Sequence, residues 1–125
     1  MENALKQMDL EFCGSGKHKI SVEKLLEKKG VVFLDVRDEL EVKAMKFDFG
    51  IFGIESINIP VNLLPDRHAE LTKDKPIACF CSSGTRSAWA YLYLFSKGYD
   101  VRWLAASNED LAALLKPGRI LKATR

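Results

Sequence analysis

The residues best suited to chemistry are Cys81 and the polar segment that follows it, which reads C-S-S-G-T-R-S and ends at Ser87. An apolar run at residues 77–80 precedes this segment, and an apolar run at residues 88–96 follows it. We predict a short buried strand for the first run and a buried helix for the second. Peptide N–H groups and the helix dipole favour negative charge at such a junction. Because this setting lowers the pKa of a thiol, Cys81 is predicted to be a nucleophilic thiolate.

The residues between Cys81 and the helix are expected to build a cradle for an anion. Gly84 is expected to adopt a backbone conformation that other residues avoid, which lets consecutive N–H groups converge. Arg86 is expected to bind an anionic substrate, with an ordinary surface arginine as the alternative. Ser87 is expected to cap the helix, to hydrogen-bond the thiolate, or to do both. The remaining polar residues are expected to offer backbone N–H groups first and hydroxyls second: Ser82, Ser83 and Thr85.

Strand-like and helix-like segments alternate along the chain and must position this loop. Strands are predicted near residue 20 and at residues 31–36, 57–59, 77–80 and 101–104. Helices are predicted from Ser21 to Gly30 and at residues 38–46, 61–71 (interrupted near Pro65), 88–96 and 108–115. Residues 47–53 are expected to form a loop. This order predicts an α/β domain whose central, mainly parallel sheet has helices on both faces. Ligands bind beyond the carboxyl ends of such strands, where Cys81 is expected to lie.

Four motifs in this chain occur in a characteristic order: L-D-V-R-x-x-x-E at residues 34–41, N-I-P at 58–60, the loop at 81–87 and K-G-Y-D-V-R-W-L at 97–104. Together they resemble the rhodanese family, the single-domain sulfurtransferases. The resemblance implies a rhodanese-like domain at residues 18–116, between an N-terminal extension (1–17) and a basic C-terminal tail (117–125). It also implies that Cys81 carries sulfur as a persulfide, without a cofactor or a metal.

Three charged residues are expected to support the site rather than to react. Asp35 ends a buried strand, where an unpaired carboxylate is costly. Arg37 and Glu41 have the spacing of a helical ion pair. The resemblance implies that Asp35 helps to organise the active-site end of the sheet and that the pair of Arg37 and Glu41 is part of the scaffold. Flanking loops could also bring further groups toward the pocket: Lys46, Arg67 and His68.

Two segments depart from the family's usual pattern. Rhodaneses usually carry G-H-I-x-G-A before N-I-P, whereas residues 50–57 contain no histidine. A Gly-Gly pair usually follows the last strand, whereas Ala105-Ala106-Ser107 stands here. We therefore expect pocket walls of a different shape around an unchanged nucleophile.

Composition and the remaining cysteines narrow the class of protein. The net charge of +2, from 19 basic and 17 acidic residues, is too balanced to favour nucleic acid as a partner. No apolar run is long enough for a membrane span, which predicts a protein without a membrane partner. The 3 cysteines lack paired spacing, which favours the reducing cytoplasm. Cys79 is expected in the core on the same side of its strand as Cys81. Cys13 is expected to be a bystander, with a resolving or sulfur-accepting role as the alternative.

The leading functional prediction is transfer of sulfane sulfur from a small anionic donor, such as thiosulfate, to a thiol or a sulfur-accepting protein. One alternative is a persulfide carrier or sulfur-responsive binding module with little turnover. Another is a phosphatase or arsenate reductase of the same fold. Those enzymes place one residue more between the cysteine and the arginine, and this loop offers no acidic proton donor.

Overall fold

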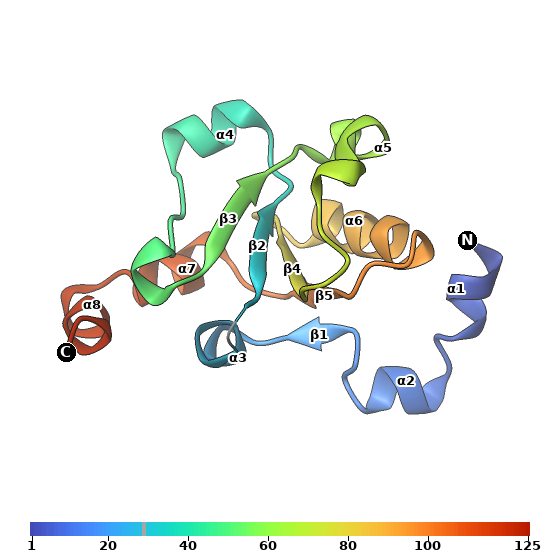
Figure 1. The fold of residues 1–125 in the computed structure, drawn as a ribbon, viewed down its shortest axis with the longest axis horizontal. Coiled ribbons are helices and arrows are strands. Elements are labelled where there is room, and N and C mark those ends of the chain that lie inside the picture. The colour runs from blue at the N-terminus through green and yellow to red at the C-terminus, as the bar shows by residue number, and fades with distance from the viewer. Residues whose placement is uncertain (29) are drawn as a thin grey trace.

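Five short strands form one sheet in which every neighbouring pair is parallel, so the predicted α/β class is confirmed (Figure 1). The computed structural model describes residues 1–28 and 30–125. The strand order is β1-β5-β4-β2-β3, which makes β4 the central strand. The strands are β1 (Lys19–Ile20), β2 (Val32–Asp35), β3 (Glu55–Asn58), β4 (Ile77–Phe80) and β5 (Val101–Leu104).

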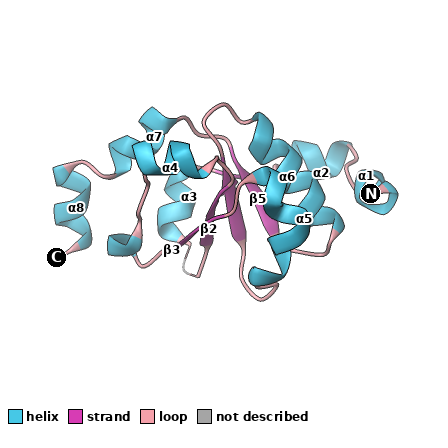
Figure 2. Ribbon diagram, turned by 90° about the horizontal axis from the view of Figure 1, so that it is seen from above, coloured by secondary structure: helices cyan, strands magenta, loops and turns pink. Residues whose placement is uncertain are grey.

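Helices cover both faces of this sheet, as Figure 2 shows from above. They are α1 (Glu2–Lys6), α2 (Leu10–Gly14), α3 (Val22–Glu27), α4 (Glu39–Ala44), α5 (Leu64–Arg67), α6 (Thr85–Ser96), α7 (Asn108–Leu114) and α8 (Pro117–Ala123). Short 3₁₀ turns are η1 (Gly50–Phe52), η2 (Val61–Leu63) and η3 (His68–Glu70). The sheet therefore separates two apolar cores, one under α5 and α6 and the other under α3 and α7.

The side chains of β4 alternate between these two cores. Cys79 and Cys81 lie in the core under α6, whereas Ala78 and Phe80 lie in the core under α3 and α7. Because successive side chains of a strand point to opposite faces, a strand buried on both faces is apolar throughout. This alternation places the Cys81 thiol on the face where α6 begins.

Several local predictions differ from the structure. Residues 1–17, an expected extension for which no helix was predicted, contain α1 and α2. The Asp9 side chain caps α2 by accepting a hydrogen bond from the Phe12 N–H (2.9 Å). The expected C-terminal tail forms α8, a helix of largely exposed side chains that begins with Pro117 at its first position. Pro65 likewise lies in the first turn of α5 and does not interrupt a longer helix.

Helix boundaries also shift from those predicted. Helix α6 begins at Thr85, three residues before the predicted start at residue 88, because the loop glycine rather than Ser87 is its N-cap. Helix α3 starts after the Ser21 cap as predicted but ends at Glu27. The predicted stop at Gly30 adjoins residue 29, which lies outside the described residues.

Candidate active site around Cys81

The Cys81 thiol lies directly after β4, under the first turn of α6. Its Sγ accepts hydrogen bonds from the backbone N–H groups of Gly84 (3.1 Å) and Ser87 (3.2 Å). The Ser87 hydroxyl oxygen lies 3.4 Å from the same sulfur. Cys81 and Ser87 are both fully buried, so these donors face the sulfur without competition from bulk water. The loop thus forms a cradle of hydrogen-bond donors around one sulfur atom.

Gly84 makes this geometry possible. It is the N-cap of α6 and has a φ of 88°, a left-handed conformation that costs little only for glycine. The turn at Gly84 brings its own N–H and that of Ser87 onto the sulfur. A Cβ at position 84 would also lie 3.4 Å from Cζ2 of Trp103. The glycine therefore serves both the backbone turn and the close approach of an aromatic ring.

The cradle lowers the pKa of the Cys81 thiol. Burial is the largest single influence and on its own favours the neutral thiol. Hydrogen bonds from the Ser87 hydroxyl and N–H and from the N–H groups of Ser83 and Gly84 act in the opposite direction, and together they lower the pKa. Cys81 is therefore a buried thiol that ionises more readily than an ordinary one.

Arg86 does not stand free at the rim of the cradle. It forms a two-point ion pair with Glu41 of α4, with Nη1–Oε1 at 2.5 Å and Nη2–Oε2 at 2.9 Å. Its Nη2 also donates to the Ser82 hydroxyl at 3.3 Å. The hydrogen bond from Arg86 lowers the pKa of Glu41, so this carboxylate is charged at neutral pH. The expected helical ion pair between Arg37 and Glu41 is wrong, because Arg37 precedes α4 and has another partner.

That partner is Asp35, at the end of β2. Arg37 Nε lies 3.0 Å from both Asp35 oxygens, and Nη2 lies 2.7 Å from Oδ2. The guanidinium also donates to the Met45 carbonyl (2.8 Å) and lies over the rings of Phe47 and Phe80. Phe80 immediately precedes Cys81, so this buried pair fixes the end of β4 from the opposite face. The Arg37 guanidinium offsets the desolvation cost of the Asp35 carboxylate, which is buried at the end of β2.

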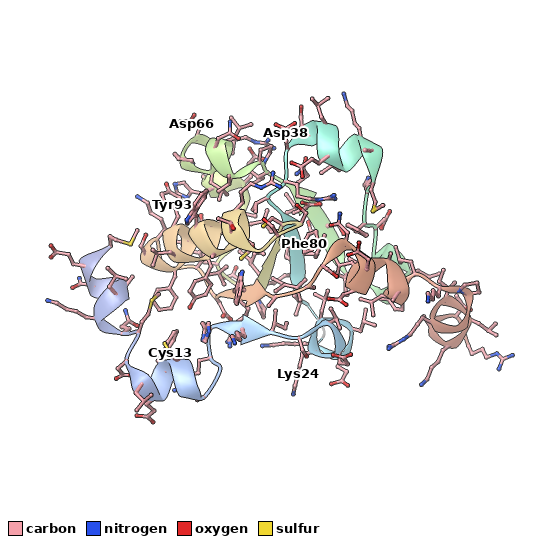
Figure 3. All side chains as sticks on the ribbon, turned by 180° about the vertical axis from the view of Figure 1, so that it is seen from behind. Cys13, Lys24, Asp38, Asp66, Phe80 and Tyr93 are labelled. Carbon is pink, nitrogen blue, oxygen red and sulfur yellow. The ribbon has the colours of Figure 1, made fainter. Side chains whose placement is uncertain are left out.

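The other two cysteines lie outside the cradle. Cys79 is buried on β4, two residues before Cys81. Its Sγ donates to the carbonyls of Ser87 and Arg102, each at 3.3 Å. Burial raises the pKa of Cys79, so it remains a neutral thiol. Cys13 is exposed on α2, well away from Phe80 and the start of α6 in Figure 3. The three thiols are all free.

The three residues on flanking loops that could have approached the pocket lie away from the Cys81 sulfur. Arg67 pairs with Glu70 (2.8 Å), and the His68 ring lies 3.0 Å from the Tyr99 hydroxyl. Lys46 lines a surface cavity of ≈ 190 Å³ beside Asp35 and the edge strand β3. None of these contacts reaches the sulfur of Cys81.

Trp103, predicted from the sequence only as a strand residue, contacts the cradle directly. Its Nε1–H lies 3.0 Å from Ser87 Oγ and 3.3 Å from the Gly84 carbonyl oxygen. On β5 it is the register partner of Cys79 on β4. Strand alternation and pairing could have placed it on the Cys81 face. A partly buried indole also needs a hydrogen-bond acceptor.

The two unusual wall segments have local structural roles. The N–H of Gly50 donates to Asp48 Oδ1 (2.8 Å) at the start of η1, where a histidine motif was absent. Ser107, which follows the alanine pair, caps α7 in a capping box with Asp110.

Across residues 1–28 and 30–125, no cluster of His, Cys, Asp and Glu side chains could hold a metal ion. None of the described helices has the length and hydropathy needed to cross a membrane.

Comparison with known proteins accounts for this arrangement. Residues 19–113 match the model of the rhodanese-like domain family. The chain belongs to this family. A curated protein of Allochromatium vinosum named "Sulfurtransferase" is 30% identical to this chain over 77 residues, which is 62% of this chain and 66% of that protein. The match therefore spans slightly less than two-thirds of that relative's length.

Solved structures of related domains share the fold. A rhodanese-related protein from Thermoplasma volcanium is 28% identical, with a TM-score of 0.67 over 80% of this chain and 95% of that one. An NAD-dependent persulfide reductase from A. fulgidus is 28% identical, with a TM-score of 0.59 over 78% of this chain and 16% of that one. The same domain thus occurs both nearly alone and as a small part of a larger enzyme.

Proposed function

We propose that this protein is a sulfurtransferase that moves sulfane sulfur from a small anionic donor, such as thiosulfate, to a thiophilic acceptor through a persulfide on Cys81. The observation that carries the proposal is the buried Cys81 sulfur with the N–H groups of Gly84 and Ser87 aimed at it. The rhodanese-like family and the sulfurtransferase name of one relative support the reaction class.

In the first half-reaction, the Cys81 thiolate attacks the outer sulfur of the donor. The S–S bond within thiosulfate breaks, a new bond forms between that sulfur and Sγ, and sulfite leaves with the electron pair. The negative charge of the resulting persulfide resides mainly on the outer sulfur. The N–H groups of the loop and the start of α6 stabilise this charge in a site that excludes water.

In the second half-reaction, a nucleophilic acceptor attacks the outer sulfur. The persulfide S–S bond breaks, the acceptor takes the sulfur, and Cys81 returns as a thiolate. The acceptor is cyanide in an assay, and a small thiol or a partner protein in the cell. The chemistry needs no cofactor or metal. The free thiols and the balanced charge support a cytoplasmic protein that acts on small anions and proteins, rather than on nucleic acid or membranes.

Intact-mass spectrometry tests the proposal. The protein is incubated with thiosulfate, desalted and weighed, and it should gain the mass of one sulfur atom. Cys81→Ser should gain none, because a serine hydroxyl cannot hold a persulfide, whereas Cys13→Ser should load normally. Loading of Cys81→Ser, or failure of the wild-type protein to load from thiosulfate and from other sulfane donors, would refute the assignment.

A second candidate function is a persulfide carrier with little turnover. It is favoured by the engagement of Arg86 with Glu41, which leaves its charge largely neutralised, and by the complete burial of Cys81. Turnover with thiosulfate and cyanide, measured beside the mass gain, separates the two candidates. An enzyme loads and turns over, whereas a carrier loads without steady thiocyanate production.

A further inference from the structure

Ser87 can use its hydroxyl proton in two ways, and only one of them serves the Cys81 thiolate. Its Oγ lies 3.1 Å from the Gly84 carbonyl oxygen and 3.4 Å from Cys81 Sγ. A hydroxyl has one proton to donate and two lone pairs to accept with. When the proton goes to Gly84, the hydroxyl can only accept from the sulfur, which suits the neutral thiol. When it goes to the sulfur, the thiolate is stabilised and the Gly84 carbonyl loses a donor.

The indole of Trp103 lies where it can compensate for that loss. Its single N–H points between the two competing groups, at 3.0 Å from Ser87 Oγ and 3.3 Å from the Gly84 carbonyl. The Gly84 carbonyl keeps the helical hydrogen bond from the Ala88 N–H (3.0 Å), and the indole N–H can replace the serine hydroxyl on its second lone pair. This replacement reduces the cost of turning the serine proton away. The indole N–H also lies within reach of Ser87 Oγ, where it occupies one of the two lone pairs and leaves the hydroxyl proton available to the sulfur.

We propose that Trp103 is a positioning residue for the nucleophile: its indole N–H holds the Ser87 hydroxyl and the Gly84 carbonyl so that the hydroxyl donates to the ionised sulfur of Cys81. This inference deepens the proposed function and rests on it only for the identity of the nucleophile. The step is a rotation of one O–H bond, and the thiol proton leaves to solvent. In the thiol state the order of donation is Cys81 to Ser87 to Gly84, and in the thiolate state Ser87 donates to Cys81 while Trp103 satisfies Gly84.

Other charges around the sulfur do not replace this relay. The Arg86 guanidinium at the start of α6 interacts electrostatically with the Cys81 thiolate, but it is paired with Glu41 of α4. At the end of β2, Asp35 is paired with Arg37. On β4 itself, Cys79 stays neutral because burial raises its pKa. The hydrogen bonds of the cradle are therefore the main influences that favour the thiolate, and the Ser87 hydroxyl heads them.

The test measures the rate at which iodoacetamide alkylates Cys81 as a function of pH, with the label located by peptide mass spectrometry. This readout does not depend on sulfur transfer. Trp103→Phe removes the N–H and part of the ring. Incorporation of β-(3-benzothienyl)alanine at position 103 removes the N–H and keeps the bicyclic shape. Trp89→Phe is the matched control, because Trp89 is the other tryptophan and is 62% exposed on the same helix that carries Ser87.

Both variants at position 103 should shift the inflection of the Cys81 profile to higher pH and slow alkylation near neutral pH by about 2- to 10-fold, the range of one ordinary hydrogen bond. Trp89→Phe should leave the profile unchanged. In a Ser87→Ala background, the changes at position 103 should have little further effect, because the relay acts through the serine hydroxyl. Circular dichroism establishes that each variant is folded.

An unchanged profile in the benzothienyl protein would overturn the proposal, since a shift in Trp103→Phe alone would then come from ring volume. An equal shift at position 103 with and without Ser87 would also overturn it. Should the wild-type protein fail to load sulfur while the alkylation shifts appear as expected, the proposed function fails and the relay stands.

Discussion

At the scale of single residues, the cysteine with the lowered pKa is not the exposed one. Cys81 is buried and has a lowered pKa, whereas Cys13 is exposed on α2 and Cys79 is buried with a raised pKa. Only the thiolate is nucleophilic, so we expect the lowered pKa of Cys81 to outweigh the greater exposure of Cys13 toward a small reagent.

We therefore predict that a small neutral alkylating agent labels Cys81 before Cys13 when the pH is below ~8.5, the value at which a free thiol ionises. As pH falls further through the lowered pKa of Cys81, its labelling should decline. Peptide mapping after short exposure measures the order. In denaturant the preference should disappear, and faster labelling of Cys13 in the folded protein would contradict the cradle.

The two-point contact between Arg86 and Glu41 changes what loss of the arginine means. Arg86→Ala removes a cation and leaves the Glu41 carboxylate unpaired beside an anion site. We predict that the KM for thiosulfate rises by about 10-fold or more, from one charge-assisted contact, with a smaller effect on kcat. High ionic strength should reduce the penalty, because part of it is exposed Coulomb repulsion.

The double variant Arg86→Ala/Glu41→Gln isolates that repulsion. It should recover part of the lost affinity, and steady-state kinetics on the four members of the cycle measure the coupling. If Glu41→Gln gives no recovery, Arg86 recognises the donor directly. If neither substitution alters KM or kcat, the ion pair only joins α4 to α6.

At the scale of elements, the junction between β4 and α6 carries the site, and Gly84 sets its geometry. In Gly84→Ala, a Cβ must adopt a φ of 88° and lie 3.4 Å from Trp103. We predict a loss of about 1–2 kcal/mol in the free energy of unfolding, the usual cost of a left-handed residue. Urea denaturation measures it. The same change should also slow sulfur loading, because the N–H groups of Gly84 and Ser87 move off the sulfur.

Gly118→Ala on α8 is the matched control. Gly118 has no neighbour within 4 Å of the added methyl and no positive φ. This substitution should be neutral or should stabilise by about 0.5–1 kcal/mol, as alanine does within a helix. Equal effects at positions 84 and 118 would contradict the role given to the turn.

Much of this junction could be predicted from the sequence. The run at residues 77–80 is apolar throughout and Gly84 follows four residues after it ends, so the strand and the turn were predictable from pattern and backbone chemistry. The start of α6 at Thr85 was not, because a polar first turn looks like loop. The partners of Glu41 and Trp103 were also missed, since they lie on other elements and local spacing favoured Arg37 for the glutamate.

At the scale of the whole molecule, the buried pair of Asp35 and Arg37 lies on the face of the sheet opposite Cys81, where Arg37 packs over Phe80. Their side chains are 6% and 2% exposed. We predict that Asp35→Ala lowers the free energy of unfolding by about 3–5 kcal/mol, because it leaves an unpaired buried guanidinium. Asp100→Ala breaks an exposed pair with Arg102 and should cost less than about 1 kcal/mol.

Asp35→Asn/Arg37→Met should restore part of the loss, because it removes both charges together. Chemical denaturation of the three variants gives the comparison. A similar small cost for Asp35→Ala and Asp100→Ala would show that the buried pair adds little to stability.

The order of the strands has a consequence for how the protein is made. β1 pairs with β5, joining Lys19 to Trp103 and Ile20 to Leu104. On the ribosome, the chain that bears Cys81 emerges before the strand that bears Trp103, and the first strand waits for the last. Pairing so distant in sequence is slow to form. We therefore expect the nascent cradle to spend this interval without the Trp103 N–H that contacts Ser87 and Gly84, so the Cys81 thiol gains its full reactivity only when the sheet is complete.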